Sequence, residues 1–190
     1  TNDRSFRNNL EDRLGLKRGE SEILVFNGEM GRKAQHGEIT SAELYAWIQS
    51  HLNLNDTEIT QFKHDFWAGD HLDEELVQLI KTLRKSYTVC VISNFMDALP
   101  QMLKTDFPVD DAFHFTVVSA HVGMMKPAPG IFEYTLQLLN LRPEETIFID
   151  DFQHNIEGCQ AVGMNGIHFR PDLNLKEALE AHGVKIDESC

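Results

Sequence analysis

Three short polar segments of the sequence could do chemistry, and each follows an apolar run. A hydroxyl, an ammonium and two adjacent carboxylates suit a phosphoryl group with a divalent cation, because carboxylates hold a hard metal and an ammonium neutralises phosphoryl oxygens. In an open α/β sheet, ligands bind beyond the carboxyl ends of the strands, so polar residues just after apolar runs are expected to share one edge. The residues are Ser93 and Asn94, Lys126, and Asp150 and Asp151.

Each segment also has a simpler structural explanation. Ser93 and Asn94 could cap a following helix, and Lys126 could be a solvated loop lysine. Asp150 and Asp151 could be acids at the start of a helix, which the helix dipole favours. Their order along the chain and their common position after apolar runs favour a joint functional interpretation over three separate ones.

From about residue 73 the sequence alternates between helical spacing and continuous apolar runs. Such runs are typical of strands that are covered on both faces, and alternation with helices indicates a parallel sheet. We therefore predict an α/β fold with a Rossmann-like, doubly wound parallel sheet and helices on both faces. The expected strands are 88–92, 113–118, 146–149 and 166–169, and the expected helices lie near 75–83, 97–104, 129–140, 152–162 and 174–182.

The first 74 residues show helical spacing and helix-start signals but no convincing strand. The segments 40–43 and 55–58 each have the capping-box pattern, in which a polar residue is followed three positions later by glutamate. We predict an all-helical cap over residues 1–74, inserted into a core of residues 75–190.

Composition excludes several classes of protein. The chain has 190 residues and a net charge of −13, with 17 basic residues against 30 acidic ones, which argues against nucleic acid as a partner. No apolar run is long enough to cross a membrane and the first ten residues are polar, so a cytoplasmic location is expected. Cys90, Cys159 and Cys190 are far apart, which predicts reduced thiols rather than disulfides.

The polar segments and their surroundings closely resemble three motifs of the haloacid dehalogenase (HAD) superfamily. The resemblance rests on the segments 92–94, 123–132 and 148–151, together with Asn155 and Gly163. Within the superfamily it is closest to the branch of sugar-phosphate phosphatases and the amino-terminal domain of soluble epoxide hydrolase. That branch carries a helical cap before the second motif, so the resemblance covers nearly the whole chain.

The resemblance implies roles for the substrate-facing residues. Ser93 would bind a phosphoryl oxygen, Asn94 would shape the substrate side, and Lys126 would hold nucleophile and phosphate together. The catalytic residues implied are Ser93, Lys126 and Asp151.

It also implies a Mg²⁺ cofactor. Asp151 would be the main ligand, Asp150 a second ligand or a neighbour of the ligands, and Asn155 would orient the groups around them.

One family motif has no counterpart in the sequence. The first motif, Asp-x-Asp at the end of the first core strand, supplies the nucleophile and the acid–base aspartate, and nothing ahead of the helical region matches it. Asp3 is no substitute, since it follows no apolar strand. We therefore expect the first core strand to be missing from this chain, whose numbering would begin downstream of the natural start.

Three functions remain open at this point. The first is a Mg²⁺-dependent phosphatase that hydrolyses a small phosphate ester through an aspartyl-phosphate. The second is a 2-haloacid dehalogenase, which needs no metal; the pair Asp150–Asp151 argues against it, because dehalogenases of this family typically carry Ser-Asn there. The third is a non-catalytic binding or regulatory module that keeps the fold.

Overall fold

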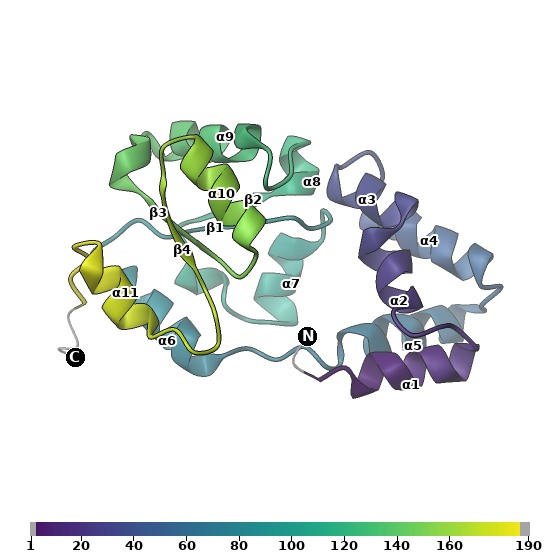
Figure 1. Ribbon diagram of the computed structural model, residues 1–190. Coiled ribbons are helices and arrows are strands. Elements are labelled where there is room, and N and C mark those ends of the chain that lie inside the picture. Colours follow the sequence, from purple (N-terminus) through teal and green to yellow (C-terminus); the bar gives the residue numbers. More distant parts are fainter. Residues whose placement is uncertain (1–2, 187–190) are drawn as a thin grey trace.

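The computed structural model describes residues 3–186, which form a helical part and an α/β part (Figure 1). Residues 5–67 contain helices and no strand. The prediction of a helical amino-terminal region is therefore confirmed, while the proposed domain boundary between residues 74 and 75 stays a prediction. The helices are α1 (Ser5–Leu14), α2 (Glu20–Glu22), the π-helix η1 (Ile23–Asn27), α3 (Glu29–Gln35), α4 (Ser41–His51) and α5 (Asp56–Trp67).

Both predicted capping boxes are present. The Thr40 hydroxyl accepts the backbone N–H of Glu43, and the Glu43 carboxylate accepts the N–H of Thr40 at 2.8 Å. Asn55 and Glu58 make the same reciprocal pair at the start of α5, again with an N–H···O distance of 2.8 Å. These pairs satisfy backbone donors that the first turn of each helix would otherwise leave without a partner, and so fix where α4 and α5 begin.

Within the described residues the α/β part has four strands, at the four predicted places and with ends shifted by at most two residues. Its elements in chain order are α6 (Glu74–Leu83), β1 (Cys90–Ser93), α7 (Leu99–Thr105), the 3-10 helix η2 (Asp110–Ala112), β2 (Phe115–Val118), α8 (Ser119–Val122), α9 (Pro129–Leu139), the 3-10 helix η3 (Pro143–Glu145), β3 (Ile147–Asp150), α10 (Gln153–Ala161), β4 (Asn165–His168) and α11 (Leu175–Ala181).

The strands are parallel but do not form one continuous sheet within the described residues. β1 pairs with β2 and β3 pairs with β4, which gives two separate two-stranded ladders. Figure 1 shows α9 and α10 on one side of the strands and α6, α7 and α11 on the other. The predicted layering is thus present, and the interruption lies between β1 and β3.

Two apolar clusters support the two parts. The larger holds Leu10, Leu44, Phe62 and Phe66 from the helical part, and it also takes in Met96, which follows β1. The second cluster packs α9 and α10 against β2 and β3. Because Met96 belongs to the first cluster, apolar packing joins the helical part to the segment that follows Ser93 and Asn94.

Hydrogen bonds reinforce this junction. The buried Ser119 hydroxyl donates to the carbonyl of Gln35 at 2.6 Å and accepts the N–H of Phe95 at 3.0 Å. The N–H of Ser41 donates to Asp97 Oδ1 at 2.8 Å. The helical part is therefore fixed directly to the loop after β1.

We expect Gly37→Ala to destabilise the protein by about 1–3 kcal/mol. Gly37 has φ +73°, and a Cβ there would collide with the carbonyl of Ala120 across the junction between the two parts. Gly15 has a similar φ of +66° but open space around it, so Gly15→Ala is the matched control for backbone strain alone. Urea unfolding should show the larger loss for Gly37→Ala; equal losses would mean that the close contact contributes nothing.

Two further observations bear on the composition-based predictions. Cys90 and Cys159 are free thiols, and Cys190 lies outside the described residues. Within residues 3–186, no helix combines the length and the hydrophobicity that crossing a bilayer requires.

Candidate active site

The loops that follow β1 and α8 are held together by Asn94 and Lys126. The Asn94 amide donates to the carbonyl of Lys126 at 2.8 Å, and the Lys126 N–H donates to Asn94 Oδ1, also at 2.8 Å. Such a two-way bond leaves the asparagine amide little freedom to rotate. Asn94 therefore places the backbone of Lys126 beside the end of β1.

The Lys126 side chain joins these loops to β3. Its Nζ lies 2.6 Å from Asp150 Oδ2, and the two side chains are only 11% and 6% exposed. The ammonium also lies 5.3 Å from the centroid of the Phe148 ring, within the range of a cation–π interaction. Asp150 is the last residue of β3, so this ion pair connects the end of β3 to the loop of Lys126, which Asn94 holds beside the end of β1.

The second oxygen of Asp150 is also engaged. Oδ1 accepts the side-chain amide of Asn155 at 2.9 Å and the N–H of Phe152 at 2.9 Å. Burial alone would raise the pKa of Asp150, but the hydrogen bonds from Lys126, Asn155 and Phe152 and the charge of Lys126 outweigh it, so its pKa is lowered. Asp150 is thus held as a carboxylate.

Asp151 and Ser93 have freer side chains. Asp151 is exposed, and its carboxylate makes no hydrogen bond or ion pair to any residue in 3–186; its carbonyl oxygen lies 3.0 Å from His168 Nε2. Ser93 is half-buried at the end of β1, and its hydroxyl likewise has no hydrogen-bond partner in that range. Both groups are therefore available to a ligand.

The residues present are compatible with a magnesium ion. No three His, Cys, Asp or Glu side chains gather in a metal-binding cluster within the described part of the chain. Mg²⁺ usually takes only one or two carboxylates and completes its shell with water and substrate phosphate, so the free carboxylate of Asp151 suffices as an anchor. Asn155 Oδ1 is buried without a hydrogen-bond partner in the described structure, as expected of an acceptor that faces a missing donor such as a metal-bound water.

Four of the sequence-predicted residues are thus joined by contacts, namely Asn94, Lys126, Asp150 and Asn155. Ser93 and Asp151 each adjoin one of these residues in the chain. His168 was not predicted, although it lies opposite Asp150 in the ladder of β3 and β4. The register between β3 and β4 places His168 beside Asp150, but this register cannot be read from the sequence.

The lowered pKa of Asp150 predicts a pH dependence of stability. A carboxyl whose pKa is lower in the folded than in the unfolded state stabilises the fold above the unfolded value of about 4, and this contribution is lost as the pH falls through the folded value. The stability advantage of the wild type over Asp150→Asn should therefore be constant near neutral pH and shrink below about pH 4. Urea unfolding between pH 3 and 7 measures it, with Asp110→Asn as an exposed control; an advantage that grew in acid would contradict the assignment.

With this geometry in place, comparison with known families is informative. A family model described as haloacid dehalogenase-like hydrolase matches residues 5–163. This chain belongs to that family. The resemblance to the HAD superfamily that was drawn from the three motifs is thereby confirmed.

The curated relatives include two phosphatases and a bifunctional epoxide hydrolase. The chain is 27% identical over 150 residues to a sesquiterpene phosphatase of Aspergillus oryzae, which covers 78% of this chain and 76% of that protein. It is 29% identical over 123 residues to a D-ribitol-5-phosphate phosphatase of Bacteroides thetaiotaomicron, covering 57% of this chain and 60% of that protein. It is 29% identical over 131 residues to the bifunctional epoxide hydrolase 2 of Rattus norvegicus, covering 64% of this chain. The chain spans about a quarter of that relative's length, since the match covers 23% of it.

Solved structures share the fold of this HAD chain. An HAD family enzyme of Bacteroides thetaiotaomicron, solved in complex with magnesium and inorganic phosphate, superposes with a TM-score of 0.77 at 24% identity, covering 94% of this chain and 92% of that one. A HAD-hydrolase of Bacillus subtilis bound to magnesium gives a TM-score of 0.64 at 17% identity, covering 94% and 90%.

Proposed function

We propose that this HAD hydrolase is a Mg²⁺-dependent phosphatase of small phosphorylated metabolites. The observation that carries the proposal is the Lys126–Asp150 ion pair, which connects the end of β3 to the loop that Asn94 holds beside the end of β1, next to a hydroxyl and a carboxylate that are free. Relatives named as a sesquiterpene phosphatase and a D-ribitol-5-phosphate phosphatase support this reaction class.

Each residue has a defined task in this proposal. The Ser93 hydroxyl donates a hydrogen bond to a phosphoryl oxygen, and the Lys126 ammonium neutralises the charge that spreads over these oxygens in the transition state. Asn94 sets the position of Lys126 through its two backbone bonds, and Asp150 holds the ammonium in place.

Asp151 and Asp150 would hold the metal, with Asn155 orienting Asp150. Mg²⁺, when bound, supplies charge neutralisation at the phosphoryl group. Asp151 is the free carboxylate of the pair, while Asp150 already accepts three hydrogen bonds. Asp151 would therefore be the main metal ligand. Asp150 would hold the Lys126 ammonium in a fixed position relative to the metal site.

The chemical step runs through an aspartyl-phosphate. A carboxylate oxygen attacks phosphorus and forms an O–P bond as the bond to the substrate alcohol breaks. An acid protonates the departing alkoxide, and water then hydrolyses the acyl phosphate. We assign neither the attacking carboxylate nor the acid to any residue in 3–186, so the test must separate binding from turnover.

The test measures phosphate binding and hydrolysis side by side. Inorganic phosphate binding by calorimetry should require Mg²⁺ and should weaken at least tenfold in Asp151→Asn, with Asp110→Asn unchanged. Hydrolysis of p-nitrophenyl phosphate, where present, should stop on addition of EDTA. Phosphate binding that is equally strong in EDTA would overturn the proposal.

The same measurements distinguish the alternatives. Mg²⁺-dependent phosphate binding without turnover would favour a binding or regulatory module. Chloride release from 2-chloropropionate in the presence of EDTA would favour a dehalogenase.

A further inference from the structure

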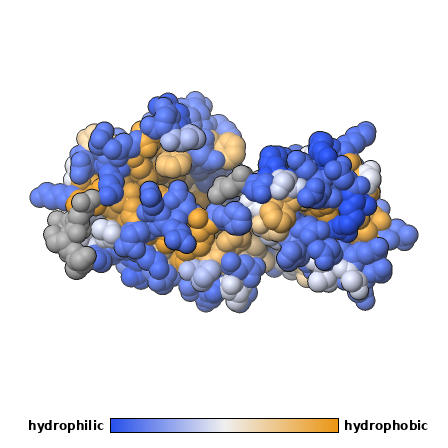
Figure 2. Space-filling view, turned by 90° about the horizontal axis from the view of Figure 1, so that it is seen from below, coloured by the Kyte–Doolittle hydropathy of each residue, from blue (hydrophilic) through white to orange (hydrophobic). Residues whose placement is uncertain are grey.

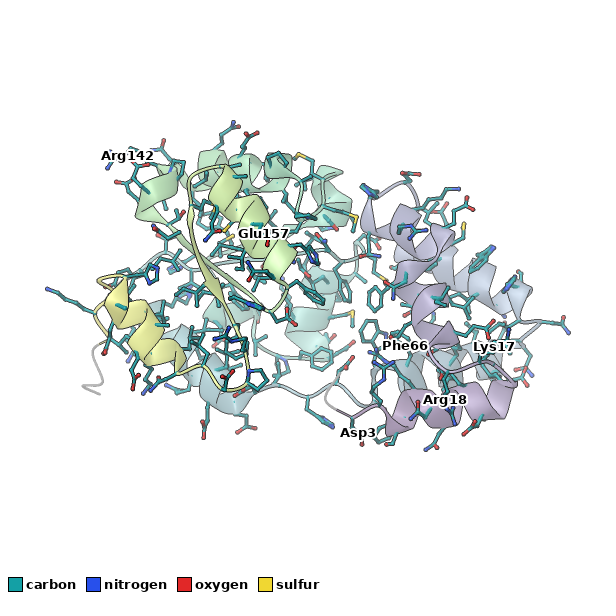
Figure 3. The ribbon with its side chains drawn as sticks, viewed as in Figure 1. Asp3, Lys17, Arg18, Phe66, Arg142 and Glu157 are labelled. Carbon is teal, nitrogen blue, oxygen red and sulfur yellow. The ribbon has the colours of Figure 1, made fainter. Side chains whose placement is uncertain are left out.

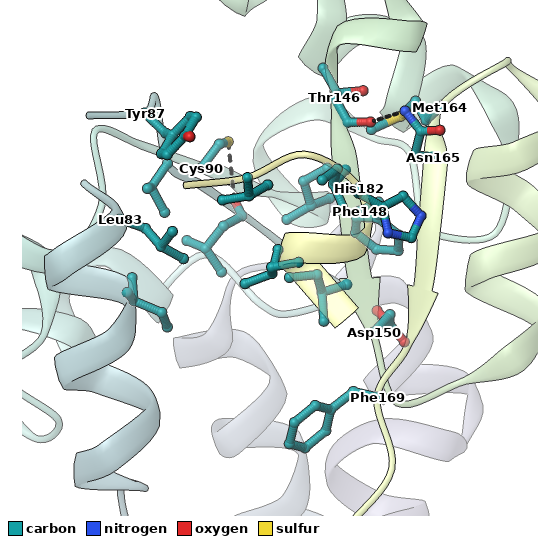
Figure 4. A pocket seen from close by; sticks show the side chains of 18 of the residues that line it. Leu83, Tyr87, Cys90, Thr146, Phe148, Asp150, Met164, Asn165, Phe169 and His182 are labelled. Carbon is teal, nitrogen blue, oxygen red and sulfur yellow. Dashed lines mark hydrogen bonds between the residues drawn. The ribbon is translucent and has the colours of Figure 1, made fainter. Parts of the chain in front are cut away.

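The segment around Asp151 lies beside an open groove between β1 and β3. The groove has a volume of about 1080 Å³, and Asp150, Asp151 and His168 are among the residues that line it. Figure 4 looks into the groove and shows Asp150 where β3 ends, next to the end of β4, with Phe169 just beyond. Figure 2 shows hydrophobic side chains at the surface of this part of the molecule. The contacts around Asp151 thus form a polar region in mainly apolar surroundings.

Hydrogen bonds hold the peptide groups on both sides of Asp151. Ahead of it, the carbonyl of Asp150 accepts the N–H of Phe169 at 2.9 Å. After it, the carbonyl of Asp151 lies 3.0 Å from His168 Nε2. The N–H of the same peptide group, which belongs to Phe152, donates to Asp150 Oδ1 at 2.9 Å. Each peptide group is planar, so holding both planes fixes the backbone torsions of Asp151 and leaves only its side chain free to turn.

His168 is the one side chain in this arrangement that has no other task in the proposed site. A carbonyl oxygen can only accept, so Nε2 of His168 carries the proton in its contact with Asp151. His168 lies on β4, opposite Asp150 in the parallel ladder. The preceding residue, Ile167, is 6% exposed and lies opposite Ile149, so core packing fixes the strand that carries the imidazole. Strands hold side chains more precisely than loops do, and His168 therefore ties Asp151 to a rigid element.

A fixed backbone matters here because the carboxylate of Asp151 is exposed and has no partner within residues 3–186. A ligand group whose backbone is already ordered loses less conformational freedom when it binds a cation, and so it binds the cation more tightly. Residues that orient a metal ligand typically change metal affinity by about 10- to 100-fold when they are replaced. The effect of His168 should therefore appear in metal affinity.

We propose that His168 is a positioning residue for the metal site. By donating to the Asp151 carbonyl, it holds the backbone so that the Asp151 carboxylate is ready to bind Mg²⁺. The inference rests on the proposed function, in which Asp151 is the main metal ligand, and it gives His168 no contact with the metal or the substrate. The effect comes from the hydrogen-bond donor and not from a charge on the ring, so a neutral amide that reaches the same carbonyl can replace it.

The test is a titration of the 190-residue chain with Mg²⁺, followed by the amide NMR signals of Asp151 and Phe152. His168→Leu removes the donor and should weaken Mg²⁺ binding about tenfold. It should also speed hydrogen exchange of the Phe152 amide, because the peptide plane that His168 holds is released. His168→Gln keeps a side-chain N–H without any charge, and it should restore both the affinity and the slow exchange.

His182 provides the matched control. Its Nδ1 lies 2.9 Å from the carbonyl of Ala178, so His182→Leu removes a histidine–carbonyl contact that does not involve Asp151 and should leave Mg²⁺ binding unchanged. A purely structural task for His168 would lower the stability of His168→Leu in urea without changing its affinity for Mg²⁺. Wild-type affinity in His168→Leu, or a loss of affinity that His168→Gln does not restore, would overturn the inference.

Asp151→Asn separates this inference from the proposed function. This variant should lose the signal shifts that Mg²⁺ causes in the wild type. If Asp151→Asn binds Mg²⁺ like the wild type, the ligand assignment fails, and the positioning task of His168 fails with it. If Asp151→Asn loses Mg²⁺ binding while His168→Leu keeps it, the proposed function stands and only the positioning task is overturned.

Discussion

Lys126→Met is expected to lower the free energy of unfolding by about 3–5 kcal/mol, because it leaves a buried carboxylate without its counter-ion. Asp150 is 6% exposed at its side chain and receives the Lys126 ammonium at 2.6 Å. Methionine keeps most of the side-chain length, so the loss is chiefly one of charge and hydrogen bonding. Urea unfolding at pH 7 measures the effect.

A surface pair provides the control for Lys126→Met. Lys81 Nζ lies 2.8 Å from Asp111 Oδ2, but these side chains are 36% and 66% exposed. Exposed ion pairs contribute about 0–1 kcal/mol, so Lys81→Met should be nearly neutral. If both substitutions cost the same, burial of the Lys126–Asp150 pair would not be the source of the effect.

The double variant Lys126→Met with Asp150→Asn tests the same account from the other side. Removing both charges removes the uncompensated carboxylate, so the double variant should be more stable than Lys126→Met alone. Both should lose Mg²⁺-dependent phosphate binding, since the proposed site needs the ammonium. Restored stability without restored phosphate binding would separate the structural task of Lys126 from its proposed functional one.

The sequence predicts the strands of this fold well because each is a continuous apolar run. The segments 88–92 and 146–149 lie within two residues of β1 and β3. Helix starts at Thr40 and Asn55 were equally predictable, since the capping-box pattern is local. Sheet continuity is not local: a run such as 88–92 predicts a strand covered on both sides, and yet β1 is only half-buried because its edge faces the open groove.

The candidate site shows the same division between local and distant information. Adjacent carboxylates at positions 150 and 151 look equivalent in the sequence, but the end of β3 buries Asp150 against Lys126 and leaves Asp151 exposed. Which of two neighbours turns inward depends on strand alternation and on a lysine that is distant in sequence. The pattern of residue types predicts the composition of the site, and only the fold assigns the partners.

Arg7 is a second residue whose partners could not be predicted from the sequence. It lies on α1 with its side chain 7% exposed, and it pairs with Glu22 at 2.8 Å and Asp70 at 3.0 Å. Its Nε donates to the carbonyl of Phe66 at 3.0 Å, and its guanidinium lies 4.2 Å from the centroid of the Phe66 ring. Figure 3 shows Phe66 within the helical part, so Arg7 connects α1, α2 and α5 from the inside.

Arg7→Met should therefore destabilise the protein by about 3–5 kcal/mol, because Glu22 and Asp70 lose a buried counter-ion and the Phe66 carbonyl loses a donor. Arg13 is the matched control: it lies on the same helix and pairs with Asp65 on α5 at 2.7 Å, but its side chain is 39% exposed. Arg13→Met should cost less than about 1 kcal/mol. Because Met96 packs in the same apolar cluster as Phe66, unfolding followed by tryptophan fluorescence and by circular dichroism should shift together in Arg7→Met; a shift in only one signal would show that the helical part unfolds independently.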